Sequence, residues 1–135
     1  MEIIKAQDIG FCFGVRRAIK KAEQAIKNLP AHEIYMLGEI IHNPQVIKKF
    51  KKKGINIIEE ISQVPPDKYL ITRAHGISRN EENYIKRNNI KLIDTTCPYV
   101  KKLHQIASVL KKEKYQIVIL GDIDHPEIKS LLSYI

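Results

Sequence analysis

The sequence predicts an α/β fold, a parallel sheet with flanking helices, and three observations support this prediction. Short apolar runs of strand length alternate with longer segments that have helical periodicity. Capping residues and prolines mark the points where most of the helices begin. The 135 residues are 44% hydrophobic and 28% charged, which is typical of a globular domain of ordinary size. Because strands and helices alternate, we expect βαβ units on a parallel sheet.

Six segments have the composition of short, largely buried strands. They are rich in isoleucine, leucine and tyrosine, and turn or helix signals separate them. A glycine-rich turn follows the first segment, and Pro65-Pro66-Asp67 forms a turn before the fourth. In chain order, the expected strands are 2–8, 34–37, 55–59, 69–72, 91–94 and 116–120.

Five helices are expected between and after these strands. The first has apolar residues at the i, i+3, i+4, i+7 spacing of an amphipathic helix, with basic residues on its other face. The others begin with an N-cap followed by proline, with a capping box, or with proline alone. In chain order, the start signals are Val15, Asn43-Pro44, the pair Ser78 and Glu81, Pro98, and Pro126.

The charge of the chain permits a nucleic-acid interpretation but does not favour it. The formal net charge is +8, and the sequence pI is about 9.5. Most lysines, however, lie on the helix faces opposite the apolar residues, and few aromatic residues are interleaved with them. We therefore interpret the charge as a solvated, lysine-rich surface and consider a nucleic-acid partner unlikely.

The sequence also points to a cytoplasmic protein without a membrane partner. No apolar stretch approaches the roughly 20 residues that span a bilayer. The first residues, Met1-Glu2-Ile3-Ile4-Lys5, lack the pattern of a signal peptide. In a reducing compartment, two cysteines indicate metal ligands or catalytic thiols rather than a disulfide.

Those two cysteines, Cys12 and Cys97, occupy similar positions. Each lies directly before an expected helix. The positive end of a helix dipole favours the thiolate form, which is the form that binds metals. Their positions therefore suit metal ligands, although a single cysteine before a helix is more often a small buried apolar residue.

Four further polar residues follow expected strands. The carboxyl ends of parallel strands meet at one edge of the sheet, where ligands bind. Helix N-termini and imidazoles at that edge suit a phosphate or another anion. Each residue alone has an ordinary explanation as a cap or first-turn acid, but the whole set at one edge favours a site. The set consists of His42, His75, His125 and Glu127, whereas His32 and His104 are expected to be structural.

Five ordered segments resemble the motifs of one enzyme family, the 4-hydroxy-3-methylbut-2-enyl diphosphate reductases, or LytB family. Together they extend over the whole chain, which makes the resemblance specific. The segments are 10–18, 38–43, 73–78, 94–100 and 121–127.

The resemblance implies a cofactor and residue roles. The family holds an iron–sulfur cluster (4Fe-4S) by three cysteine thiolates, and Cys12 and Cys97 match two of them. The third ligand is absent from this chain, which has two cysteines. The histidines that hold the substrate diphosphate are matched by His42, His75 and His125. Glu127 matches the acid that delivers a proton.

The resemblance also implies an activity and an architecture. The family removes the allylic hydroxyl of its substrate reductively, giving isopentenyl and dimethylallyl diphosphate in the non-mevalonate pathway. A ferredoxin or flavodoxin supplies the electrons. Its chains are about twice as long, with three similar α/β domains in a pseudo-threefold arrangement. We expect residues 1–97 to form the first domain and 98–135 the truncated start of the second, and we expect this chain alone to be inactive.

The residues by themselves leave other functions open. One is a non-catalytic metal-binding module that uses both cysteines and a histidine, with zinc or an iron–sulfur cluster. Another is a phosphate-binding α/β module whose cysteines are incidental. A third is the basic nucleic-acid-binding module, for which a steep salt dependence of affinity would be the signature.

Overall fold

The structure, a computed structural model, describes residues 1–7 and 9–135 and confirms the α/β prediction. Its sheet has four parallel strands in the order β2-β1-β3-β4. The strands are β1 (Ile34–Leu37), β2 (Asn56–Ile58), β3 (Tyr69–Ile71) and β4 (Lys91–Ile93). The helices are α1 (Phe13–Asn28), α2 (Pro44–Lys52), α3 (Arg79–Arg87), α4 (Pro98–Lys112) and α5 (Pro126–Leu132), with 3₁₀ turns η1 (Ala31–Glu33) and η2 (Ile61–Gln63).

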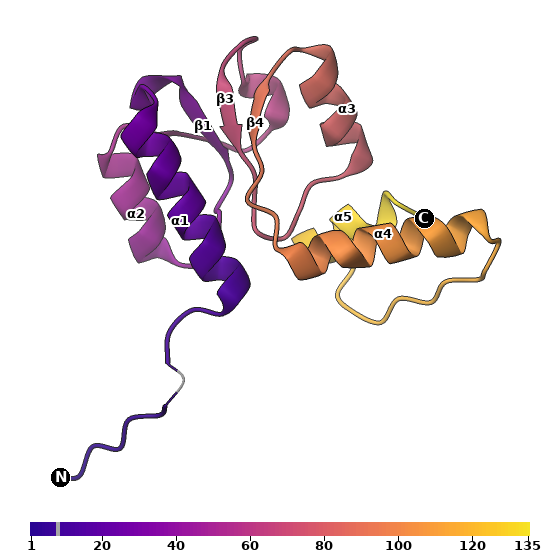
Figure 1. The fold of residues 1–135 in the computed structure, drawn as a ribbon, viewed down its shortest axis with the longest axis horizontal. Helices are drawn as coiled ribbons and strands as arrows, with labels where there is room; N and C mark the ends of the chain where they lie inside the picture. Colours follow the sequence, from indigo (N-terminus) through magenta and orange to yellow (C-terminus); the bar gives the residue numbers. More distant parts are fainter. Residues whose placement is uncertain (8) are drawn as a thin grey trace.

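Helices cover both faces of the sheet (Figure 1). Ile34 and Met36 of β1 pack with α1 and α2 on one face, whereas Leu37 packs with α3 and η2 on the other. This division follows from the strand geometry, because successive side chains point to opposite faces. Both faces of β1 are therefore buried, as its unbroken apolar sequence predicts.

The core beneath α1 and α2 depends on side-chain size. Ala18 and Ala22 of α1 are fully buried, and these small side chains let the helix backbone approach the sheet closely. Phe50 of α2 is also fully buried and fills the space between the helices. Burial of an aromatic side chain of this size contributes about 1.5–3 kcal/mol.

The expected helix starts are confirmed in detail. The Asn43 side chain accepts hydrogen bonds from the amides of Gln45 and Val46, both at 3.1 Å. The Ser78 hydroxyl accepts from the Glu81 amide, and the Glu81 carboxylate accepts from the Ser78 amide, which completes the capping box. These local bonds fix where each connecting loop ends, and so where the site residues lie.

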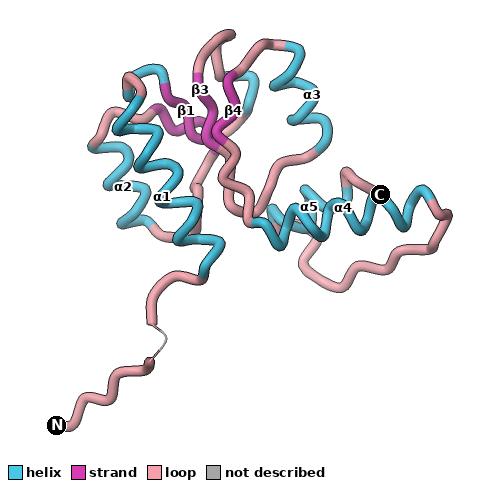
Figure 2. The backbone as a smooth tube through the Cα atoms, viewed as in Figure 1, coloured by secondary structure: helices cyan, strands magenta, loops and turns pink. Residues whose placement is uncertain are grey.

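Two of the six expected strands are wrong within the described residues. Residues 2–7 form no strand and are exposed, and Asp8 of that predicted strand lies outside the described residues. Residues 116–120 form no strand either, and Val118 and Leu120 are 78% and 93% exposed. The first segment projects away from the body (Figure 1), and the second belongs to the long loop before α5 (Figure 2).

The physical reason is that a strand needs a hydrogen-bonded neighbour. An apolar pattern makes a segment suitable for a sheet, but it does not supply the partner for its N–H and C=O groups. The described residues place no strand beside either segment. The predicted domain division at residue 97 stays a prediction.

The last two helices lie against each other beyond the end of the sheet (Figure 2). Leu131 of α5 and Ala107 of α4 are 5% exposed. No helix in the described ranges combines the length and the apolar character that crossing a membrane requires.

Candidate functional site

Three loops meet at the carboxyl edge of the sheet, and Ala74 joins them. The Ala74 amide donates to the Ile40 carbonyl at 3.1 Å, which connects the loop after β3 to the loop after β1. The Ala74 carbonyl accepts from the Cys97 amide at 2.9 Å, which connects it to the loop after β4. These bonds hold the segments that carry His42, His75 and Cys97 side by side.

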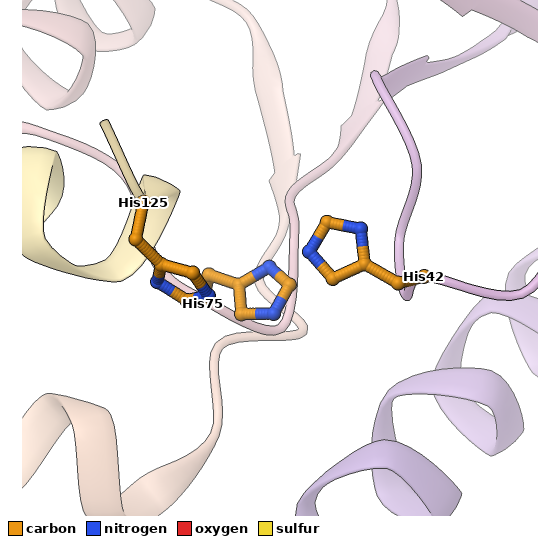
Figure 3. A group of neighbouring side chains, drawn as sticks. All are labelled: His42, His75 and His125. Carbon is orange, nitrogen blue, oxygen red and sulfur yellow. The ribbon is translucent and has the colours of Figure 1, made fainter. Parts of the chain in front are cut away.

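The three histidines predicted from the sequence converge at this edge (Figure 3). His42 follows β1, His75 follows β3, and His125 is the N-cap of α5. The ring centroid of His75 lies 4.8 Å from that of His42 and 5.4 Å from that of His125. One ring nitrogen from each histidine lies within 4.8 Å of the other two. We call these residues the histidine triad.

The spacing of the triad suits an oxyanion better than a metal ion. Tetrahedral Zn²⁺ with Zn–N bonds of about 2.1 Å brings its ligand nitrogens to about 3.4 Å from one another. Three hydrogen bonds of about 2.9 Å that converge on one oxygen place the donor nitrogens about 4.7 Å apart. The triad nitrogens extend over up to 4.8 Å. A phosphate oxygen therefore fits between the rings as they stand, whereas zinc requires them to close in.

Two triad members have defined hydrogen-bonding roles. Nδ1 of His125 accepts from the Glu127 amide at 3.3 Å, so Nε2 carries the proton and can donate to a ligand. Nδ1 of His75 is buried and has no hydrogen-bond partner among residues 1–7 and 9–135. An unpaired buried nitrogen costs about 1–3 kcal/mol, so a ligand that pairs with it binds more tightly.

Electrostatics keep His75 neutral. Burial, followed by the neighbouring His42, His125 and Arg73, lowers the pKa of His75 from 6.5 to about 4. At neutral pH the ring therefore carries one N–H and no charge. An anion placed between the rings reverses this balance, because negative charge favours the imidazolium.

A cavity of about 340 Å³ continues from the triad. His42 and His75 line it, and so do the cationic side chains of Lys51 and Arg73 and the acids Glu39 and Glu59. Arg73 is fixed by a hydrogen bond from its Nε to the Leu37 carbonyl at 3.1 Å. The cavity thus has room for the rest of a phosphorylated ligand, and its lining offers two cations beside two acids.

Gly38 makes the position of Arg73 possible. A Cβ atom at residue 38 would lie 2.7 Å from an Arg73 guanidinium nitrogen, and the Gly38 φ angle is +55°. Sequence reasoning missed both residues. The available signal was a cation two positions before His75, next to a predicted anion site.

The two cysteines are both N-caps, as predicted. Cys12 caps α1 and Cys97 caps α4, and both thiols are free. A Cβ atom at Gly14 would lie 2.6 Å from Cys97 Sγ, so the first turn of α1 touches the second thiol. Arg17 Nη1 donates to the Thr96 carbonyl at 3.1 Å and holds α1 against this loop. Gly14 is a further residue that sequence reasoning missed.

The positions of Cys12 and His125 require a correction. Both were expected to follow strands, but the strands at 2–8 and 116–120 do not form in the described residues. Cys12 is placed instead by the packing of α1, and His125 by the packing of α5. The site therefore combines the ends of β1, β3 and β4 with the N-termini of α1, α4 and α5, whose N-caps are Cys12, Cys97 and His125. His104 is 5% exposed, which agrees with its predicted structural role.

The fold and the site together define a class of protein: a parallel α/β protein with thiols and imidazoles gathered at the carboxyl edge of its sheet. The particular family follows from comparison with known proteins. The LytB protein family model matches residues 3–135. The chain belongs to the LytB family.

Two curated proteins similar to this chain carry the same name. The 4-hydroxy-3-methylbut-2-enyl diphosphate reductase of Thermoanaerobacter sp. (strain X514) is 45% identical over 130 residues, which are 95% of this chain and 45% of the relative. The Helicobacter pylori (strain Shi470) protein of that name is 44% identical over 135 residues, covering 99% of this chain and 47% of the relative. This chain thus spans slightly less than half the length of these curated relatives.

Solved structures give the same result. A structure of (E)-4-hydroxy-3-methyl-but-2-enyl diphosphate reductase, described as the terminal enzyme of the non-mevalonate pathway, matches 98% of this chain and 46% of its own, with a TM-score of 0.83 and 39% identity. The reductase structure from Plasmodium falciparum matches 93% of this chain and 39% of its own, with a TM-score of 0.88 and 38% identity. At this identity the likeness extends beyond the fold to the family.

Proposed function

We propose that this chain is the N-terminal part of an iron–sulfur reductase that converts 4-hydroxy-3-methylbut-2-enyl diphosphate to isopentenyl and dimethylallyl diphosphate. The reaction takes up two electrons and two protons and releases the allylic hydroxyl as water. The observation that carries the proposal is the histidine triad, with ring nitrogens within 4.8 Å of one another. Family membership and the names of the relatives support it.

In this proposal the triad holds the diphosphate. His125 donates from Nε2, because its Nδ1 is occupied by the Glu127 amide. His75 uses its unpaired Nδ1, and His42 approaches from the exposed side. Lys51 and Arg73 offer cationic partners along the neighbouring cavity, which Glu39 and Glu59 also line. Charge-assisted hydrogen bonds of this type contribute about 1.5–3 kcal/mol each.

Cys12 and Cys97 would hold the iron–sulfur cluster. Thiolates are the usual ligands of such clusters. The contact of Cys97 Sγ with Gly14, two residues from Cys12, fits two ligands of one group. Such a cluster supplies electron transfer to the substrate. Two thiolates are fewer than the three that the family uses, so the third must come from outside these 135 residues.

Glu127 would deliver a proton. It lies in the first turn of α5, two residues after His125, so the acid and a diphosphate ligand belong to one rigid helix. Protonation of the departing hydroxyl makes water the leaving group, which is the task of a general acid. The electrons would come from a one-electron carrier such as ferredoxin or flavodoxin.

Binding of inorganic pyrophosphate tests the proposed anion site. Isothermal titration of this chain at pH 7 is expected to give saturable binding, because three imidazole donors converge on one space. The His125→Ala variant is expected to bind about 10-fold more weakly, the effect of one lost hydrogen bond to a charged group.

The matched control is His32→Ala. His32 is exposed in η1, outside the triad, so this variant should bind like the wild type. Equal affinity in the wild type and in His125→Ala would refute the assignment of the triad to the diphosphate.

Cluster assembly gives a separate prediction. After anaerobic reconstitution with iron and sulfide, this chain alone is expected to show little stable cluster by EPR and no turnover of the allylic diphosphate. The reason is that a two-thiolate set leaves more of the cluster exposed to water and chelation than a three-thiolate set. A full, stable complement of cluster together with turnover would disprove this.

A second candidate function is a phosphate-binding α/β module whose cysteines are incidental. The observation in its favour is that the triad and its cavity are complete within this chain. The Cys12→Ser, Cys97→Ser double variant separates the two. Pyrophosphate affinity that is retained in this double variant would favour the second function, whereas affinity that is lost together with the thiols would favour the reductase.

A further inference from the structure

A buried carbonyl connects two members of the triad from behind. The Ile77 carbonyl accepts a hydrogen bond from the Ser130 hydroxyl at 2.9 Å. The Tyr134 hydroxyl lies 3.2 Å from this carbonyl and has a nearer acceptor in the Glu82 carboxylate, at 2.9 Å. Ile77 is two residues after His75, and Ser130 is five residues after His125 in α5. The loop that carries one triad member is therefore bonded to the helix that carries another.

His104 completes this arrangement. Its Nε2 lies 3.2 Å from the Ser130 oxygen, and the two residues are 5% and 4% exposed. Because the Ser130 hydroxyl gives its proton to Ile77, its oxygen accepts from Nε2–H of His104. The imidazole also stacks on the Tyr134 ring, with centroids 4.2 Å apart and planes 16° from parallel. Burial lowers the pKa of His104, which keeps this single-donor form at neutral pH.

Gly76 shows how closely the loop is held. A Cβ atom there would lie 2.8 Å from Cε1 of His104 and 3.1 Å from the Ser130 oxygen. The Gly76 φ angle is +87°, a conformation that other residues rarely adopt. Gly76, the residue next to His75, thus packs closely against both side chains. A substitution of His104 or Ser130 can therefore change the position of Gly76 and, with it, that of His75.

We propose that His104 and Ser130 are positioning residues for the diphosphate site. With the Ile77 carbonyl and Tyr134 they form a polar clamp that sets the separation of His75 and His125, whose ring centroids are 5.4 Å apart. The inference rests on the proposed role of the triad in diphosphate binding. It assigns to His104, which lies outside the triad, an effect on ligand affinity in addition to its role as a buried core residue.

The test measures pyrophosphate affinity and stability in the same set of variants. Ser130→Ala removes the hydroxyl, and His104→Phe keeps a ring against Tyr134 but removes the N–H donor. Both are expected to bind pyrophosphate about 10-fold more weakly, because the His75–His125 spacing is no longer fixed. His104→Gln places an amide N–H near the position of Nε2 and is expected to restore affinity to within about 2-fold of the wild type.

The variants are expected to rank differently in stability than in pyrophosphate affinity. This difference distinguishes an effect on the position of the triad from an effect on folding. His104→Gln loses the ring stack, so its unfolding midpoint in urea should fall although its affinity recovers. Ser62→Ala is the matched control, because it removes an exposed serine of η2 whose hydroxyl donates to the Glu60 carboxylate at 3.2 Å, in an element that carries no clamp residue. It should change neither quantity.

Two outcomes would overturn the clamp. One is wild-type affinity in Ser130→Ala and His104→Phe, whatever their stability. The other is affinity that follows the unfolding midpoint through the whole set, with no rescue in His104→Gln. Failure of the underlying proposal has another signature: the wild-type chain would not bind pyrophosphate, or a triad variant would bind it as tightly as the wild type.

Discussion

A His75→Gln variant of this chain is expected to lose inorganic pyrophosphate affinity by about 10- to 100-fold. His75 lies between the other two triad rings, with centroids 4.8 Å from His42 and 5.4 Å from His125. Its buried Nδ1 has no hydrogen-bond partner in the described part of the chain and is expected to gain one from the anion. Loss of a hydrogen bond that becomes charge-assisted on binding costs about 1.5–3 kcal/mol, which gives the range above. Calorimetric titration at pH 7 measures it.

The same variant should be less sensitive to acid. The pKa of His75 is lowered from 6.5 to about 4 in the folded chain, so folding favours the neutral ring. Its contribution to stability is complete above pH 6.5 and is lost as the pH falls toward 4, because the unfolded chain takes up the proton first. Because His75 is partly exposed, solvent screens part of this effect. We therefore expect His75 to account for a loss of about 1–2 kcal/mol in the free energy of unfolding over this pH range.

Urea unfolding at pH 7 and pH 4.5 checks this, with His32→Ala as the control. Between these pH values, the free energy of unfolding should fall more in the wild type and the control than in His75→Gln. The difference should be about 1–2 kcal/mol, as given above.

Pyrophosphate binding to the wild type should be accompanied by proton uptake below pH 7, because the anion raises the pKa of His75. Binding heats that do not vary with the ionisation heat of the buffer would contradict this.

Replacing Gly14 with alanine is expected to disrupt the thiol pair. In an exposed helix this substitution stabilises by about 1 kcal/mol, because alanine is the better helix former. At Gly14, however, the new Cβ would lie 2.6 Å from Cys97 Sγ and 3.2 Å from its Cβ. Contacts this short force α1 away from Cys97, and overpacking of this kind costs about 1–3 kcal/mol.

The expected result is a net loss of up to about 2 kcal/mol in the free energy of unfolding and a faster reaction of Cys97 with a thiol reagent. Gly121→Ala is the matched control, since its Cβ meets only the end of the flexible Ile128 side chain, at 3.0 Å. A Gly14→Ala variant that is more stable than the wild type, with unchanged Cys97 reactivity, would show that the thiol does not depend on this contact.

The sequence allowed correct prediction of every element whose signal is local. The capping box at Ser78, the asparagine cap at Asn43 and the prolines at 98 and 126 all place helices where the structure has them. The strands β1 to β4 were equally accessible, because each is a short apolar run between turn signals. Local bonds determine these features, and a single sequence contains the residues that make them.

What could not be predicted depends on contacts between distant parts of the chain. The segments 2–8 and 116–120 have the pattern of strands, but pairing decides whether a strand forms. The contact of Gly14 with Cys97 and the hydrogen bond from Ser130 to Ile77 join residues far apart in sequence. The triad was predicted as a group because parallel strand ends meet at one edge, although His125 arrives there through α5.

Ala74 has a consequence for how the two halves of the site behave together. Its amide is bonded to Ile40 and its carbonyl to Cys97, while the next residue is His75. The peptide units on either side of Ala74 are rigid planes, so a tilt that follows Cys97 also turns the segment leading to His75. A displacement of the Cys97 backbone would therefore also displace His75, and a molecule that moves one of these two segments would move the other.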